Sequence, residues 1–248
     1  MSEGILAPVN EPQTASITAG EALAGTFSRP SETFERLRKS PTWWLPFLLW
    51  MLFGIGGAVA MMGKVDWERS ARDAMEKRAK AGGPAVPEDA LPRIAGMMKT
   101  MGTVMAPVGT AVFFFVIALV LWGAAKMFAG EVRFGQMLAL WGHANLGNVV
   151  GTVLSIPVLL AMAPESLTLD GLPRAVKSNL GAFLPEDSAP AVLSLASAFD
   201  IFSLATLALT VLAFRRIPGL SKGAATAIPI VLWLLFVIGR AGFMAMRG

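Results

Sequence analysis

The sequence predicts an all-α membrane protein, a bundle of five transmembrane helices with a short interfacial helix near the amino terminus. Two observations lead to this fold class. Hydrophobic residues make up 54% of the 248 residues and charged residues only 15%, which is too little charge for the surface of a soluble domain of this size. The hydrophobic residues also lie in long blocks, and a helix needs about 20 apolar residues to cross the roughly 30 Å hydrocarbon core.

Five blocks reach the length of a membrane crossing, and each is too long and too apolar to be a buried helix of a soluble core. Apolar and polar residues do not alternate in these blocks, as they would in the strands of a transmembrane barrel. Together the blocks form one predicted transmembrane domain, residues 27–246. The predicted helices are 43–62, 101–125, 137–163, 191–214 and 224–246.

The amino-terminal region divides into two parts. Residues 1–26 are rich in Ala, Thr, Pro, Gly and Glu without periodicity, so we expect a disordered tail. Residues 31–39 have Ser31 as a helix cap and place Phe34 and Leu37 on one face, which predicts a short helix on the membrane surface. The first apolar block starts too late in the chain for a cleavable signal peptide, so we expect it to stay as a membrane helix.

The order of the loops predicts their sides of the membrane. Alternating crossings put the two longest loops, 63–100 and 164–190, on one side and the amino terminus on the other. Arg215, Arg216 and Lys222 lie in a short turn without opposing acids, and short loops dominate the positive-inside rule. We therefore expect the amino terminus in the cytoplasm.

Catalytic motifs are absent from the sequence. It has no cysteine, one histidine (His143), and no metal-binding, phosphate-loop or nucleophile-elbow pattern. Ser155 lies about 18 Å from His143 along a helix, which argues against a triad with Asp200. We expect no enzymatic activity, no cofactor and no metal ion. The basic residues behind the net charge of +4 are scattered among acids, so membrane lipids rather than nucleic acid are the expected partners.

Polar residues inside the apolar blocks form the candidate site. Ionisable groups in hydrocarbon cost about 2.5–3.5 kcal/mol on insertion scales, so they usually face the bundle interior with a partner. Three roles remain open for these residues: a buried polar clamp between helices, a lining for a lipid headgroup or solute, and a proton or ion relay. The candidates are His143, Asn145 and Asn148 in the third block, Asp200 in the fourth and Arg240 in the fifth.

Asp200 and Arg240 are predicted to meet as a buried ion pair. By helical rise they lie about 22 and 27 Å from the same membrane face, and Asn148 would complete their hydrogen bonds. His143 lies close enough to the end of its block to form a hydrogen bond at the membrane interface. Gly147 and Gly151 form a GxxxG pattern, which allows close helix packing either within the bundle or in a dimer.

Several short motifs follow one another in a recognisable order. The first is Phe27-x-x-Pro30-x-x-x-Phe34-x-x-Leu37, followed by Pro41-x-Trp43-Trp44-x-x-Pro46. The others are Lys126-Met127-Phe128-Ala129-Gly130-Glu131-Val132-Arg133-Phe134-Gly135-Gln136, then Phe199-Asp200-Ile201-Phe202-Ser203-Leu204 and Gly219-Leu220-Ser221-Lys222-Gly223-Ala224. In this order they resemble the Ypt-interacting protein (Yip) domain family, particularly its bacterial branch, over about residues 27–246.

The resemblance implies five membrane helices and a cytoplasmic amino terminus. Eukaryotic members of the family act in vesicle traffic and associate with Rab-type GTPases and with one another. This chain has no evident segment for docking a GTPase, so that partner is not expected here. The resemblance also favours the cytoplasmic membrane of a bacterium as the location.

Taken together, these observations favour a non-enzymatic membrane organiser or scaffold that binds lipids, other membrane proteins or itself. The alternative is a small transporter or lipid-moving protein that uses the intramembrane polar residues. A bundle that closes around Asp200 would favour the first hypothesis. A cavity lined by Asn145, Asn148 and Asp200 would favour the second.

Overall fold

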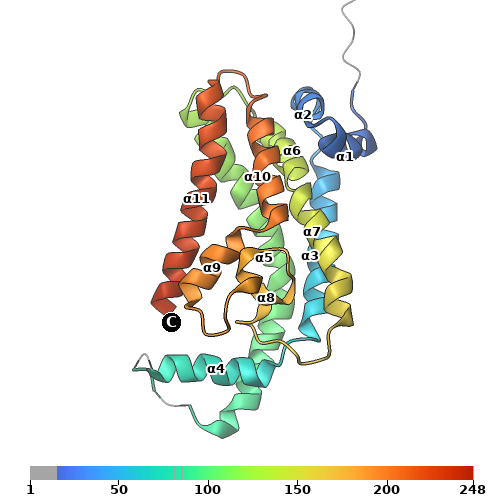
Figure 1. The fold of residues 1–248 in the computed structure, drawn as a ribbon. Coiled ribbons are helices and arrows are strands. Elements are labelled where there is room, and N and C mark those ends of the chain that lie inside the picture. Colours follow the sequence, from blue (N-terminus) through green and yellow to red (C-terminus); the bar gives the residue numbers. More distant parts are fainter. Residues whose placement is uncertain (1–15, 81, 85, 248) are drawn as a thin grey trace, which may run out of the picture.

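The structure is a computed structural model, and it describes residues 16–80, 82–84 and 86–247. Within these residues the regular elements are helices, joined by turns and two isolated backbone bridges. The long helices run side by side, and α4 (Trp67–Lys80) lies across their direction at one end (Figure 1). We call the end that carries α1 (Ala19–Ser28) and α2 (Pro30–Lys39) the amino-terminal end, and the opposite end the α4 end.

Four helical segments among the described residues are long and apolar enough to cross a membrane, in agreement with the predicted class of protein. Their length follows from uninterrupted apolar sequence, in which Pro107 and Pro229 are tolerated inside helices. The segments are α3 (Trp44–Met62), α5 (Leu91–Met127) with the short helix Glu88–Ala90 before it, α6 (Phe134–Ala144) continued by α7 (Leu146–Ala161), and α11 (Lys222–Arg247).

The predicted fourth helix, 191–214, is not continuous. It divides into α9 (Pro190–Ala198) and α10 (Ile201–Phe214), so the count of five full membrane helices is not confirmed. The physical reason is Asp200, whose Oδ1 accepts hydrogen bonds from the backbone N–H groups of Phe202 and Ser203 at 2.9 and 3.1 Å. A side chain that caps the first turn of a helix in this way favours a new helix start over continuation of the old one.

The predicted disordered tail is wrong for its last part. Residues 1–15 lie outside the described residues, but 19–26 belong to the helix α1. The helix starts at a capping box, which the composition of the tail does not reveal. The N–H of Glu21 donates to the hydroxyl of Thr18, and the Glu21 carboxylate accepts from the N–H of Thr18 at 2.9 Å. Hydrogen bonding of the Glu21 carboxylate to Thr18 holds the pKa of Glu21 below its ordinary value.

The helix predicted over 31–39 is present as α2, but its apolar face does not point to lipid. Phe34 and Leu37 are completely buried in the protein, where they join the core formed with α6 and α10. Burial of two large side chains against the bundle stabilises the fold more than their insertion at a headgroup surface would. The expectation of a helix held on the membrane by this face is therefore corrected, since α2 packs onto the bundle itself.

The two ends of the bundle carry the loops that alternation predicted. At the α4 end, loops 63–100 and 164–190 meet: the N–H of Asp66 donates to the carbonyl of Leu167 at 2.7 Å, and Lys77 pairs with Asp170 at 2.8 Å. The second loop carries α8 (Leu172–Ala175) and the 3-10 helix Leu180–Phe183. At the amino-terminal end, the two short turns meet through the N–H of Glu131 and the carbonyl of Pro218 at 2.8 Å.

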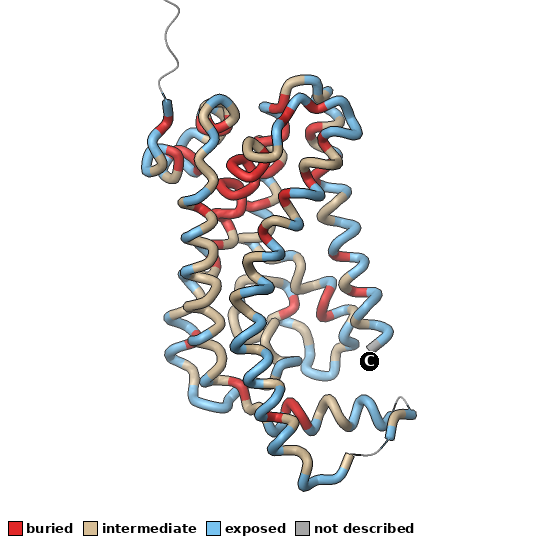
Figure 2. The backbone as a smooth tube through the Cα atoms, turned by 180° about the vertical axis from the view of Figure 1, so that it is seen from behind, coloured by how far each residue is buried: buried red, intermediate tan, exposed pale blue. Residues whose placement is uncertain are grey.

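The buried core lies towards the amino-terminal end. Figure 2 shows the buried residues concentrated in and around α6, whereas the helices are far more exposed towards the α4 end. The largest buried side chains come from α2, α5, α6 and α10, namely Phe34, Phe114, Met137 and Phe214. One end of the bundle is therefore tightly packed, while the helices are less completely covered by one another farther along.

Candidate intramembrane binding site

A cavity of about 370 Å³ lies inside the bundle among α5, α6, α10 and α11, with contributions from α7 and α9. Its two walls differ in chemistry. The side chains from α5 are all apolar, and so are those from α11 apart from Arg240, whereas α7, α9 and α10 supply amide and hydroxyl groups. The lining residues are Phe113, Ile117, Val120, Leu121, Trp141, Asn148, Ser197, Ala198, Ser203, Thr206, Leu207, Thr210, Pro229, Leu232, Trp233, Phe236, Val237 and Arg240.

On one side the cavity reaches the outer surface at α5 and α11. Phe113 and Phe236, which line it, are also 41% and 50% exposed, and their rings are in contact at 6.2 Å. On the opposite wall, Trp141 and Thr206 are only 9% and 5% exposed. The exposed side chains of α5 and α11 around the cavity are apolar, so in a bilayer this side faces lipid rather than water.

Three polar atoms of the lining residues are buried and have no hydrogen-bond partner in the described part of the chain. They are Nε1 of Trp141, Oγ of Ser197 and Oγ1 of Thr206. A buried polar group without a partner costs about 1–3 kcal/mol, so native proteins rarely leave one unsatisfied. Oγ1 of Thr206 lies against Gly147 of α7 and Oγ of Ser197 lies against Gly181, so these two hydroxyl groups belong to contacts between elements rather than to the cavity itself.

The predicted ion pair between Asp200 and Arg240 is wrong. None of the ion pairs found among the described residues includes either side chain. Asp200 caps α10 and also accepts a short hydrogen bond from the hydroxyl of Ser178, and Nε of Arg240 donates to Oγ of Ser194 at 3.0 Å. The prediction assumed a continuous helix from 191 to 214, and the break at Asp200 turns its carboxylate to the backbone instead.

The other predicted site residues form two separate groups. Nδ2 of Asn148 donates to Oδ1 of Asn145 at 2.9 Å, and the hydroxyl of Ser203 donates to Oδ1 of Asn148 at 3.4 Å, which links α7 to α10. Of these two asparagines, only Asn148 lines the cavity. His143 is fully buried, with Nδ1 2.9 Å from the carbonyl oxygen of Ala139, so this contact lies within its own helix, α6. The five candidates are thus not one cluster.

Gly147 and Gly151 lie where α10 packs against α7. A Cβ at Gly147 would come within 3.0 Å of the backbone nitrogen of Thr206, and one at Gly151 within 2.7 Å of the ring of Phe202. The GxxxG pattern is therefore used within the bundle. It also sets the position of Thr206 in the cavity wall.

Sequence reasoning missed most of the cavity. Ser203, Thr206 and Thr210 lie on one face of α10 at spacings of three and four residues, and this polar stripe in an apolar helix was the signal that could have been used. Hydroxyl side chains attract little notice in membrane helices, because they can bond to their own backbone, as Thr210 does to the carbonyl of Thr206 at 2.7 Å. Trp141 and Ser197 carried no such pattern.

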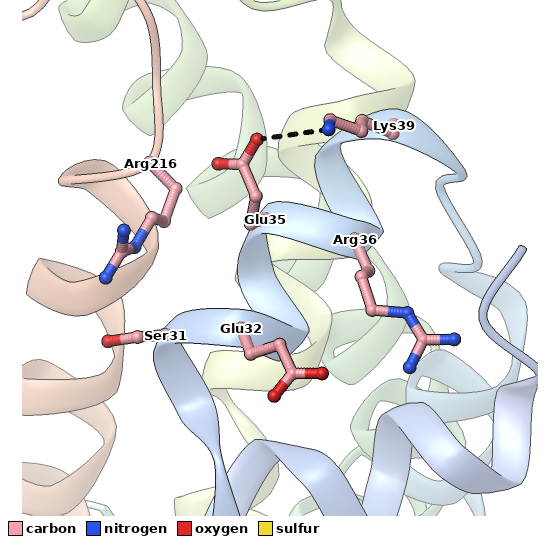
Figure 3. A pocket seen from close by; sticks show the side chains of 6 residues that line it. All are labelled: Ser31, Glu32, Glu35, Arg36, Lys39 and Arg216. Atoms are coloured by element: carbon pink, nitrogen blue, oxygen red, sulfur yellow. Dashed lines mark ion pairs between the residues drawn. The ribbon is translucent and has the colours of Figure 1, made fainter. Parts of the chain in front are cut away.

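A second hollow, of about 360 Å³, lies at the surface of the amino-terminal end (Figure 3). It is lined by Ser31, Glu32, Glu35, Arg36 and Lys39 of α2 and by Arg216 of the turn after α10. Its charged side chains take part in ion pairs: Oε1 of Glu35 lies 2.6 Å from Nη2 of Arg38 and 3.9 Å from Nζ of Lys39. The mixture of acids and bases defines no single ligand chemistry, so the intramembrane cavity is the stronger candidate.

The fold defines a multi-pass helical membrane protein with an internal cavity. The chain belongs to the Yip1 domain family, whose family model matches residues 24–242. It is 25% identical to "Membrane protein YknW" of Bacillus subtilis (strain 168) over 228 residues, which is 92% of each chain. No solved structure matches the chain. The family resemblance expected from the sequence motifs is thus confirmed.

Proposed function

We propose that this Yip1-family protein is a non-enzymatic membrane organiser that binds membrane lipid in the cavity between α5 and α11. One observation carries the proposal: a cavity with one apolar and one polar wall reaches the face of the bundle that contacts hydrocarbon. Its volume of about 370 Å³ lies within the range of about 300–1,000 Å³ typical of sites for small molecules. Lipid is the one ligand that surrounds this face in the cell.

The chemistry of the lining supports binding over catalysis. The described residues that line the cavity include no carboxylate, histidine or cysteine. The guanidinium of Arg240 stays protonated and cannot act as a general base, and the hydroxyl groups lack a neighbouring base to activate them. A transport role would have needed Asn145, Asn148 and Asp200 to line a path, and only Asn148 lines the cavity. We therefore do not propose transport.

The proposal includes an orientation. The turn between α10 and α11 carries Arg215, Arg216 and Lys222, and by the positive-inside rule these charges support a cytoplasmic amino-terminal end. Location in the cytoplasmic membrane of a bacterium is consistent with the Bacillus subtilis relative. Other membrane proteins, or a second copy of this chain, are the further partners of an organiser.

The test is a purification in mild detergent followed by mass spectrometry of the retained lipids and proteins. Ile117→Trp fills the cavity, and Val116→Trp, its neighbour on the lipid-facing side of α5, serves as the matched control. We expect the wild type and Val116→Trp to retain lipid in a fixed ratio to protein, and Ile117→Trp to lose most of it. Equal retention in the two variants would contradict the proposal.

A further inference from the structure

Arg240 is the charged side chain of the cavity, and the described residues give it no acidic partner. Nε donates to the neutral hydroxyl of Ser194, which belongs to α9 and is 5% exposed. An arginine on a membrane helix is costly unless a counter-charge or water compensates it, and a hydroxyl group supplies no charge. The guanidinium has five N–H donors in a planar fork, which suits the two oxygens of a phosphate group.

The depth of Arg240 places it near a headgroup layer. It follows Lys222, the first residue of α11, by 18 residues, or about 27 Å of helix. The hydrocarbon core is about 30 Å thick, so a helix that starts at one interface brings Arg240 close to the other. This is the interface at the α4 end, on the opposite side of the membrane from α1 and α2.

The remainder of the cavity suits one hydrocarbon chain. Along α11 the lining runs from Arg240 through Phe236 and Leu232 to Pro229, about 16 Å of helix directed towards the amino-terminal end. Phe113 and Ile117 of α5 complete this apolar wall. Trp141 of α6 and Thr206 of α10 form part of the opposite wall.

Resting on the proposed function, we infer that the lipid bound in this cavity is a phospholipid of the leaflet at the α4 end, with its phosphate on Arg240 and one acyl chain between α5 and α11. The recognised chemistry is a phosphate group joined to a hydrocarbon chain. A free phosphate ion would satisfy Arg240 alone and would leave the apolar half of the cavity unfilled.

Native mass spectrometry of the full chain with added lipid tests the inference. The probes are phosphatidylglycerol, diacylglycerol with the same acyl chains, and inorganic phosphate. For the wild type we expect phosphatidylglycerol to bind at least about tenfold more tightly than diacylglycerol, as charge-assisted hydrogen bonds to one phosphate would give. Arg240→Gln should remove this preference.

Two controls keep the outcomes separate. Arg93→Gln removes an exposed arginine at the α4 end that does not line the cavity, and it should leave the preference unchanged. A thermal melt confirms that each variant is folded, and Arg240→Lys, which keeps a positive charge, should retain part of the preference. A preference that survives Arg240→Gln would overturn the inference, as would inorganic phosphate binding as tightly as phosphatidylglycerol. The proposed function fails separately, if Ile117→Trp retains as much lipid as Val116→Trp.

Discussion

Asp200 shows how one carboxylate can redirect a membrane segment. In an apolar stretch it looks like a buried charge that needs a cation. The structure instead satisfies it with the backbone N–H groups of Phe202 and Ser203 and with the hydroxyl of Ser178. Hydrogen bonds from the neutral backbone of a helix start stabilise a carboxylate without any ion pair.

A double-mutant cycle on Asp200 and Arg240 checks this assignment of partners. Asp200→Ala should destabilise the protein by about 0.5–2 kcal/mol through loss of the cap. Because Asp200 and Arg240 share no hydrogen-bond partner, adding Arg240→Leu should give losses that sum to within about 0.3–0.5 kcal/mol. Thermal or denaturant unfolding in detergent measures both. A coupling above about 1 kcal/mol would instead indicate the direct ion pair.

At the residue scale, the sequence identified which side chains are unusual but not what each one contacts. Asp200, Arg240 and Asn148 all take part in interactions between elements, and the reason to notice them was the cost of polar groups in hydrocarbon. Their partners Ser178, Ser194 and Ser203 are ordinary serines, whose positions depend on how the helices pack. Spacing along a single helix carries no information about that packing.

At the scale of single elements, the contact between α7 and α10 holds one wall of the cavity in place. Gly147 lets the backbone of α10 approach so closely that a Cβ would meet backbone atoms of Thr206 and Phe202 at 3.0 and 3.1 Å. A backbone cannot move aside as the end of a flexible side chain can. The helix contact therefore requires the missing side chain of Gly147.

Gly147→Ala should cost about 1–3 kcal/mol through overpacking and should shift Thr206 away from the cavity. Gly109→Ala is the matched control, because Gly109 lies inside α5 with nothing within 4 Å of its missing Cβ. Alanine is the better helix former, so the control should be neutral or more stable by up to about 1 kcal/mol. Melting temperatures in detergent compare the two. Equal stability would show that α7 and α10 are not in close contact.

Long apolar helices were the most predictable elements, and short capped ones the least. α3, α5 and α11 follow from runs of apolar residues that leave no other structure for the segment in a bilayer. α1 was missed because its start depends on the reciprocal hydrogen bonds of Thr18 and Glu21, which the composition of the tail does not show. The break before α10 was missed because the mean hydropathy of an apolar segment hides a single charged residue such as Asp200.

At the scale of the whole molecule, the bundle has two different ends. The amino-terminal end has the packed core, α1, α2 and the short basic turns, whereas the α4 end has the long loops and α4 lying across the bundle axis (Figures 1 and 2). The cavity reaches the outer surface at α5 and α11 and extends towards the less packed end through Arg240. The cavity itself could not be predicted from the sequence, because it depends on the separation of α5 and α11.

Cysteine labelling in intact cells tests this two-ended arrangement in the membrane, and the native chain has no cysteine to interfere. Cysteines at positions 126, 133, 216 and 222 should share one side of the membrane with the amino-terminal helices, and cysteines at 77 and 177 should lie on the other. In the orientation proposed here, a membrane-impermeant reagent added outside labels only 77 and 177. Labelling of 77 and 222 from the same side would contradict the arrangement.

The central claim is that lipid occupies the cavity between α5 and α11. A structure of the protein in lipid nanodiscs, determined with a bound antibody fragment as a rigid marker, tests it most directly. We expect elongated density that runs along Phe113 and Phe236 and ends at Arg240. If the side chains of α5 and α11 instead close this space and leave no such density, lipid binding in the cavity is contradicted.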